Sequence, residues 1–136
     1  MDLSDLSTKE AADDGAVLEL RGPTGAPIMQ DDGAPVTITL LGADSDVLTR
    51  VANQQTNRYL RDRGAATMTA EGATANRIDY LAAATVAWSG IKVDGDVLDC
   101  TRDEARKLYR RFPFIRDQAS AFVDDRANFL KASPKT

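Results

Sequence analysis

Acidic side chains recur along this chain in closely spaced pairs, and paired carboxylates are what general acid–base catalysis and oxygen-ligand metal sites require. The pairs are Asp13/Asp14, Asp31/Asp32, Asp44/Asp46, Asp94/Asp96 and Asp124/Asp125. All except the last fall in predicted turns or helix caps, where aspartate accepts hydrogen bonds from nearby backbone amides. The segment Asp94-Gly95-Asp96 also lacks the later ligands of an EF-hand loop. We therefore predict structural roles for these carboxylates, and no catalytic or metal-binding residues among them.

Other reactive groups are scarce in the sequence. The chain contains no histidine, which removes the most common general base and transition-metal ligand. Its single cysteine, Cys100, precedes a predicted helix and could be activated there, but a small half-buried apolar residue is the favoured interpretation. The glycines at 22 and 25 lead into a strand rather than a helix, which argues against a phosphate-binding loop. The sequence thus predicts no cofactor and a protein that is not an enzyme.

Positive charge is concentrated in residues 102–116 of an otherwise acidic chain, whose net charge is −4. The six basic residues there are Arg102, Arg106, Lys107, Arg110, Arg111 and Arg116. Helical spacing puts the residues at 102, 106 and 110 on one face, with 107 and 111 beside them. This face is interpreted either as a solvated outer surface or as a docking patch for an acidic protein surface. Nucleic acid is the weaker choice of partner because the overall charge repels it.

The composition fits one globular domain with a modest core, since 43% of the 136 residues are hydrophobic and 28% are charged. The most apolar segment, 80–88, is far shorter than a membrane helix, so no membrane association is predicted. The acidic, polar start of the chain is unlike a signal peptide. With a single cysteine, these features favour a reducing, cytoplasmic location.

Alternating apolar and polar residues predict two strands, at 16–21 and 35–41. The turn-forming residues at 22–25 and 31–33 indicate an antiparallel hairpin with a long, irregular tip. Because two strands are only marginally stable alone, this hairpin must pack on helices or join the sheet of another chain. A second, small hairpin is predicted near 91–99, around the Asp-Gly turn.

Helical patterns account for most of the remaining chain. The expected helices cover 45–63, 73–88, 101–111 and 114–130. Asp44 or Ser45 caps the first helix, and Thr101 with Glu104 forms a capping box at the third. The predicted fold class is α+β, mainly helical, with the N-terminal hairpin packed on about four helices. One domain is expected over 16–131, with the hairpin at 16–41, the helical part at 45–131, flexible tails at 1–15 and 132–136, and no internal repeat.

The ordered pattern of residues 86–130 is similar to that of a known family. Its matching features are Trp88-Ser89-Gly90-Ile91, Asp94-Gly95, Cys100-Thr101, Leu108-Tyr109, Phe112-Pro113, Arg116-Asp117-Gln118 and Asp125-Arg126-Ala127-Asn128-Phe129-Leu130. Together with 22–47, where a sheet segment leads into a helix, this region resembles the tail assembly chaperones of long-tailed, siphovirus-type bacteriophages.

The resemblance implies a non-enzymatic protein of the bacterial host cytoplasm whose partners are the tape-measure protein and the tail-tube protein. Such chaperones keep the long helical tape-measure chain soluble during tail-tube assembly and are usually absent from the finished virion. The candidate partner-binding residues are Arg102, Arg106, Lys107, Arg110, Arg111, Phe114, Arg116, Phe122, Arg126 and Phe129. The alternative is a virion structural protein, such as a tail-tube, tail-completion or connector subunit, in which the 17–41 hairpin donates strands to the sheet of a neighbour. Homo-oligomerisation is left open in both cases.

Overall fold

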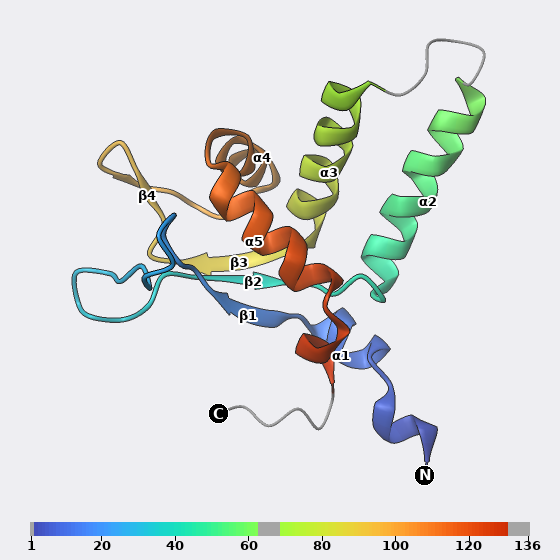
Figure 1. Ribbon diagram of the computed structural model, residues 1–136, viewed down its shortest axis with the longest axis horizontal. Coiled ribbons are helices and arrows are strands. Elements are labelled where there is room, and N and C mark those ends of the chain that lie inside the picture. The colour runs from blue at the N-terminus through green and yellow to red at the C-terminus, as the bar shows by residue number, and fades with distance from the viewer. Residues whose placement is uncertain (1, 63–68, 131–136) are drawn as a thin grey trace.

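The computed structural model describes residues 2–62 and 69–130 (Figure 1). In chain order its elements are η1 (Leu3–Leu6), α1 (Lys9–Asp14), β1 (Ala16–Glu19), β2 (Thr37–Leu40), α2 (Asp46–Arg61), α3 (Ala70–Ala84), β3 (Thr85–Ser89), β4 (Lys92–Val93), β5 (Asp96–Val97), α4 (Arg102–Arg111), α5 (Pro113–Asp124) and η2 (Arg126–Phe129), where η marks a short 3-10 helix. This architecture confirms the predicted α+β class, with an N-terminal hairpin packed on helices and a second hairpin formed by β4 and β5.

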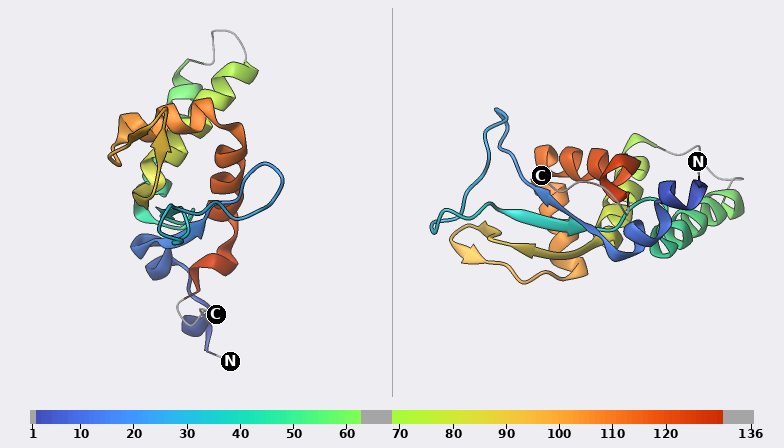
Figure 2. Two further views of the ribbon diagram at one scale, coloured as in Figure 1. Left: turned by 90° about the vertical axis from the view of Figure 1, so that its left-hand side faces the viewer. Right: turned by 90° about the horizontal axis from the view of Figure 1, so that it is seen from below.

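The main sheet has three antiparallel strands in the order β1-β2-β3. Its centre is Ile38 of β2, which is fully buried and lies between Leu18 of β1 and Trp88 of β3. The neighbouring Thr37 and Thr39 belong to the opposite face, because side chains alternate along a strand. Ile38 packs in one core cluster with residues of α3, α4 and α5. Figure 1 shows these helices above the sheet, and the view from below shows the strands in front of the helical layer (Figure 2).

The hydrophobic core lies between this sheet and the helices. Its largest fully buried side chain is Tyr109 of α4, whose hydroxyl shares a 2.6 Å hydrogen bond with the hydroxyl of Thr85. Burial raises the pKa of Tyr109 to about 12, so this hydroxyl stays protonated. Helix α3 contributes Leu81 and the alanines at 82–84, all buried, and side chains this small allow close packing of α4 against α3.

A ring of three backbone hydrogen bonds lies at the end of the β1–β2 ladder from which the long connection leaves. The Leu20 amide donates to Val36 (2.9 Å), the Val36 amide donates to Ile28 (2.9 Å), and the Ile28 amide donates to Leu20 (3.0 Å). These three residues are spaced eight apart, and Leu20 and Val36 are buried in the core. The ring therefore satisfies three backbone amides at a point where the chain leaves regular strand structure.

The tip expected to be irregular is built from two copies of one turn. In each copy the fourth residue of the turn is glycine, with φ of 93° at Gly25 and 87° at Gly33, a conformation that favours glycine. The Gly25 amide donates to Gly22 and the Gly33 amide donates to Gln30, both at 2.9 Å. Gly-Ala-Pro follows the same pattern at 25–27 and 33–35. The expectation of no internal repeat was therefore wrong for this short segment.

Gln118 of α5 holds the first of these turns against the helices. Its Oε1 accepts from the Arg21 amide (2.9 Å) and its Nε2 donates to the Arg21 carbonyl (2.6 Å). The side-chain amide thus pairs with both backbone groups of Arg21, as a residue of a neighbouring strand would. We expect Gln118→Ala to lower the free energy of unfolding by about 1–2 kcal/mol, because both hydrogen bonds are lost. Urea denaturation measures this loss. Gln54→Ala, on the exposed side of α2, is the matched control, and equal effects of the two substitutions would contradict the assigned role.

The N-terminal segment differs from the flexible tail expected at 1–15. Residues 9–14 form α1, whose Ala12 is 1% exposed and packs with Ala16 and Phe129 in a second small core. The Gly42 amide donates to the Ala12 carbonyl at 3.0 Å, and a side chain at Gly42 would collide with both Ala12 and Phe129. The segment is ordered because Gly42 leaves room for Ala12 and the distant Phe129 packs on it. Neither contact can be seen in the local sequence.

The helix expected over 73–88 was wrong at its last four residues, 85–88. Helix α3 begins earlier, at Ala70, and ends at Ala84. Thr69 is its N-cap, and the Thr69 hydroxyl accepts from the Gly72 amide (3.0 Å). Residues Thr85–Ser89 form β3, which pairs with β2 and makes the hairpin a three-stranded sheet. The β-branched Thr85 and Val86 favour a strand, and the free edge of β2 supplies its hydrogen-bonding partner.

The last helix is also shorter than the expected 114–130. Helix α5 starts at Pro113 and ends at Asp124, and η2 follows after Asp125. The Asp125 carboxylate accepts from the Ala127 amide at 3.0 Å, so this residue caps a new turn instead of continuing the helix. The break turns Phe129 towards α1.

Local signals elsewhere were correct. Ser45 caps α2 by accepting from the Leu48 amide (3.2 Å), and Thr101 caps α4 by accepting from the Glu104 amide (3.1 Å). Asp94 and Gly95 have φ of 53° and 87°, as the type I′ hairpin turn requires. The last residue of the helix expected over 45–63 and the tail expected at 132–136 lie outside the described residues.

Candidate functional site

Helices α2 and α3 rise side by side beyond the rest of the fold (Figure 1). Only Leu48, near the start of the sixteen-residue helix α2, is fully buried. Val47 and Val51 pack partly on the core, but further along the side chains of Tyr59 and Leu60 are 43% and 52% exposed. The C-terminal half of α2 therefore carries large apolar side chains that are largely exposed.

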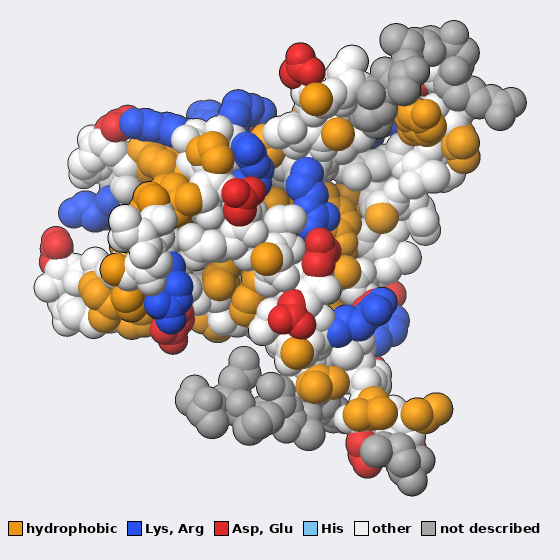
Figure 3. Space-filling model, viewed as in Figure 1, with side chains coloured by type: hydrophobic (Ala, Val, Ile, Leu, Met, Phe, Trp, Pro, Cys, Tyr) orange, Lys and Arg blue, Asp and Glu red, His pale blue; other side chains and the backbone are white. Residues whose placement is uncertain are grey.

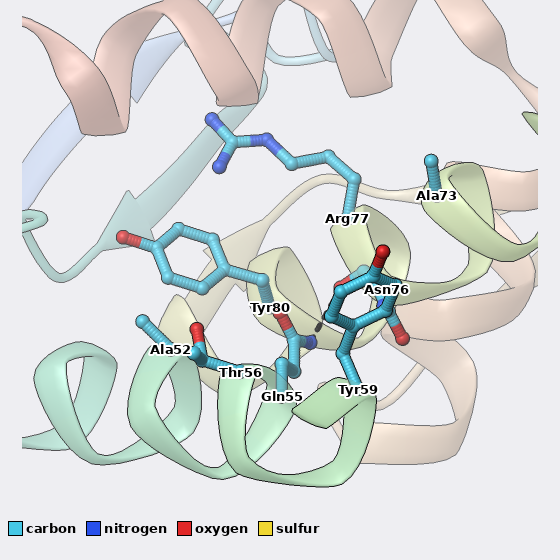
Figure 4. Close-up of a pocket in the computed structure, with 8 residues that line it drawn as sticks. All are labelled: Ala52, Gln55, Thr56, Tyr59, Ala73, Asn76, Arg77 and Tyr80. Carbon is cyan, nitrogen blue, oxygen red and sulfur yellow. Dashed lines mark hydrogen bonds between the residues drawn. The ribbon is translucent and has the colours of Figure 1, made fainter. Parts of the chain in front are cut away.

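The first groove lies between these two helices, with a volume of about 530 Å³. Its lining residues are Ala52, Gln55, Thr56 and Tyr59 of α2 and Ala73, Asn76, Arg77 and Tyr80 of α3 (Figure 4). A hydrogen bond from Gln55 Nε2 to the Asn76 carbonyl (2.8 Å) ties the helices together across it. Small residues such as Ala52 and Ala73 leave the space open.

Arg77 borders this groove but is already engaged within the fold. Its guanidinium lies 4.8 Å from the ring centre of Tyr80 and donates to the Ser120 hydroxyl (2.8 Å) and to Asp124 (2.6 Å). These contacts connect α3 to α5. The groove therefore offers a mixed apolar and amide surface without a free charge on Arg77.

A second groove, of about 470 Å³, lies on another face of α3, towards α4 and α5. Its lining residues are Ala70, Glu71, Thr74, Ala75 and Ile78 of α3 together with Arg110 and Arg116. The lining positions 70, 74 and 78 alternate with 73, 77 and 80 around the helix, so the two grooves flank the same segment of α3.

Three of the six basic residues at 102–116 that were predicted to bind a partner form ion pairs within the fold. Arg106 contacts Asp79 (2.9 Å) of α3, and Arg111 contacts Asp94 (2.7 Å) in the small hairpin. Lys107 lies at 4.0 Å from the carboxylate of Glu104 on its own helix. The Arg111 guanidinium lowers the pKa of Asp94 through hydrogen bonds and charge. Arg106 and Arg111 thus hold α4 to its neighbours, which sequence spacing alone could not show.

The other three, Arg102, Arg110 and Arg116, have no carboxylate within ion-pair distance in the described part of the chain. Arg116 Nη1 donates to the Tyr109 carbonyl (3.1 Å), which stabilises the last turn of α4. Lys and Arg side chains gather along the upper edge of the molecule, over α4 (Figure 3). Of the three, Arg110 and Arg116 line the second groove and Arg102 does not.

The remaining predicted binding residues support the fold. Phe129 is 2% exposed, and the half-buried Phe122 packs edge-on against it with ring centres 5.7 Å apart. Phe114 is half-buried beside Phe112 and lines a small cavity of about 180 Å³. Leu20, Ile28 and Val36 of the hairpin line the same cavity. Arg126 donates to both carboxylate oxygens of Asp44. Phe129 is therefore a core residue and not part of an exposed binding surface.

Some of the paired carboxylates accept hydrogen bonds from backbone amides, as predicted, whereas Asp44 and Asp94 pair with arginine side chains instead. Asp13 accepts from the Asp46 amide (2.7 Å), and Asp32 accepts from the Ala34 amide (2.9 Å). Among the described residues, no three or more Cys, Asp and Glu side chains converge as a metal site would need. Burial raises the pKa of the Cys100 thiol, which disfavours the reactive thiolate.

Comparisons with protein families, with curated proteins and with solved structures found no match to this chain. Within 2–62 and 69–130, none of the helices has the length and apolar character needed to cross a bilayer.

Proposed function

We propose that this protein is a non-enzymatic tail assembly chaperone of a long-tailed bacteriophage, which binds helical segments of the tape-measure protein. The observation that carries the proposal is the presence of an open groove on each side of one segment of α3. Amphipathic helices bind to other proteins by laying their apolar side chains into grooves of this kind. The sequence resemblance supplies the identity of the client.

Shallow grooves suit a chaperone that must release its client. Each lining combines small alanines with one large side chain that is already buried, Tyr80 in the first groove and Ile78 in the second. A bound helix therefore buries limited additional apolar area at each groove, which gives modest affinity. Many copies bound along one long helical chain would nevertheless keep that chain soluble. Arriving tail-tube protein would then displace the chaperone in the host cytoplasm, and the mature virion would lack it.

Co-expression with a helical fragment of the tape-measure protein tests this proposal. We expect the fragment to become more soluble and to co-elute with the chaperone. The double substitution Ala73→Trp/Ala75→Trp places an indole in each groove. It should weaken binding about tenfold or more, because the client helix can no longer enter the grooves. Ala121→Trp, which changes an exposed alanine of α5 outside both grooves, is the matched control. A fragment that stays insoluble and fails to co-elute would reject the proposal.

A virion structural subunit is the second candidate, and the open side of the sheet favours it. Val17 of β1 and Val86 of β3 are 52% and 53% exposed. Within the described residues β1 pairs only with β2, so its outer edge is free to add a strand from a neighbour. Mass spectrometry of purified virions separates the two candidates, because a structural subunit would be present in fixed copy number and a chaperone would be missing.

A further inference from the structure

The groove between α3, α4 and α5 combines an apolar floor with two cations that lack an anionic partner. Ile78, which is 3% exposed, and the small Ala75 provide apolar surface in it. Arg110 and Arg116 line the same groove, and neither forms an ion pair with any described residue. Glu71 is the one carboxylate in this lining, and it lies in the first turn of α3, where it complements the positive helix end.

These two arginines differ from the cations around them. Arg77, Arg106 and Arg111 each contact a carboxylate, at 2.6, 2.9 and 2.7 Å respectively. Their charges are thus largely balanced within the fold, and their hydrogen-bonding groups are occupied. A guanidinium matches a carboxylate with two parallel hydrogen bonds, so the unpaired arginines are suited to carboxylates from another molecule.

We propose that this groove binds an amphipathic helix of a partner protein, with carboxylates of that helix paired to Arg110 and Arg116. The proposal rests on the proposed function, because it names the surface and the chemistry by which a client would be recognised. Ala75 and Ile78 contact the small apolar residues of the helix. Glu71 repels excess negative charge, so the groove favours a helix with clustered carboxylates over a uniformly acidic one.

Binding of a synthetic peptide tests the proposal directly. The probe is a fluorescein-labelled helical peptide of about 20 residues, rich in alanine and leucine, with two glutamates spaced four apart beside the apolar stripe. Fluorescence anisotropy should show binding that weakens as salt is raised from about 50 to 300 mM. The same peptide with glutamine in place of glutamate should bind weakly, and single-stranded oligonucleotide should not compete.

Charge reversal at one arginine locates the site. Arg110→Glu should weaken peptide binding about three- to tenfold, since an ion pair becomes a repulsion. Arg102→Glu makes the same change on the same helix outside the groove and should leave binding unchanged. Glu71→Gln should strengthen binding slightly, because one repulsion is removed. Arg116 is left intact because its side chain also caps α4.

Ala75→Glu supplies a second, independent test if Arg110→Glu disturbs α4. It places a carboxylate in the groove from α3, at an exposed helical position, and should weaken binding to a similar extent. Equal binding by the parent chain, Arg110→Glu and Ala75→Glu would overturn the proposal, as would stronger binding to the oligonucleotide than to the peptide. If the peptide binds at this groove but tape-measure fragments do not bind, the chaperone function fails and the groove assignment stands.

Discussion

Phe129→Ala is expected to lower the free energy of unfolding by about 3–5 kcal/mol, the usual cost of removing a buried phenyl ring. The ring is 2% exposed and packs on Ala12 and Ala16, with Phe122 edge-on beside it. Its loss leaves a cavity that Gly42 cannot fill, because glycine has no side chain. We therefore expect α1 to detach from η2 as well, which adds exposed apolar surface.

Urea denaturation at neutral pH measures this effect, and proteolysis of residues 9–15 reports the release of α1. Phe114→Ala is the matched control, since that ring is only half-buried and should cost less. A loss below about 1 kcal/mol in Phe129→Ala would show that the second core contributes little to stability.

Asp44→Asn is expected to lower the free energy of unfolding by about 2 kcal/mol at neutral pH and to make that free energy depend less on pH in the acid range. The side chain is 25% exposed, accepts two hydrogen bonds from Arg126 (2.8 and 2.9 Å) and also accepts one from the Thr8 hydroxyl. These contacts, first Arg126 and then Thr8, lower the pKa of Asp44 from 3.8 to about 2. The carboxylate thereby links η2 and the residue before α1 to the start of α2.

The direction of the pH effect follows from that lowered pKa. Because the folded state holds the Asp44 proton less tightly than the unfolded state, the stabilisation is complete above about pH 5. It is lost as the pH falls through 3.8 towards 2. Urea midpoints measured between pH 7 and pH 2 should therefore fall less in Asp44→Asn than in the parent chain. Asp96→Asn, an exposed carboxylate in β5, is the control, and parallel curves for parent and Asp44→Asn would contradict the assignment.

Elements with a local chemical signal were predictable from sequence. The hydroxyls of Ser45 and Thr101 cap the helices that follow them, and the Asp94-Gly95 pair forms its turn, because each depends on residues within a few positions. The strand β3 was missed because Thr85 and Val86 continue an apolar, alanine-rich helix without a break. Only the free edge of β2, brought close by the hairpin, makes a strand the better solution there.

The candidate site shows the same division between local and distant causes. Helical spacing correctly placed Arg102, Arg106 and Arg110 along α4, but it could not show that Asp79 of α3 would neutralise one of them. The grooves also depend on α3 standing between α2 and α4, an arrangement that no short segment encodes. Phe129 was predicted to contact a partner because it was expected to lie on an aromatic-bearing last helix, whereas it packs against the distant Ala12.

The pairing of α1 with η2 also bears on the order in which the protein can form. Residues 12 and 129 lie near opposite ends of the sequence, so their contact closes the largest loop among the clusters of the fold. During synthesis on the ribosome, α1 can already contact Gly42 and Asp46, but the aromatic ring that covers Ala12 is added only when residue 129 has emerged. The sheet and helices α3 to α5 need no contact with α1 and η2 to bury their shared core, so we expect the packing of Phe129 on Ala12 to form late.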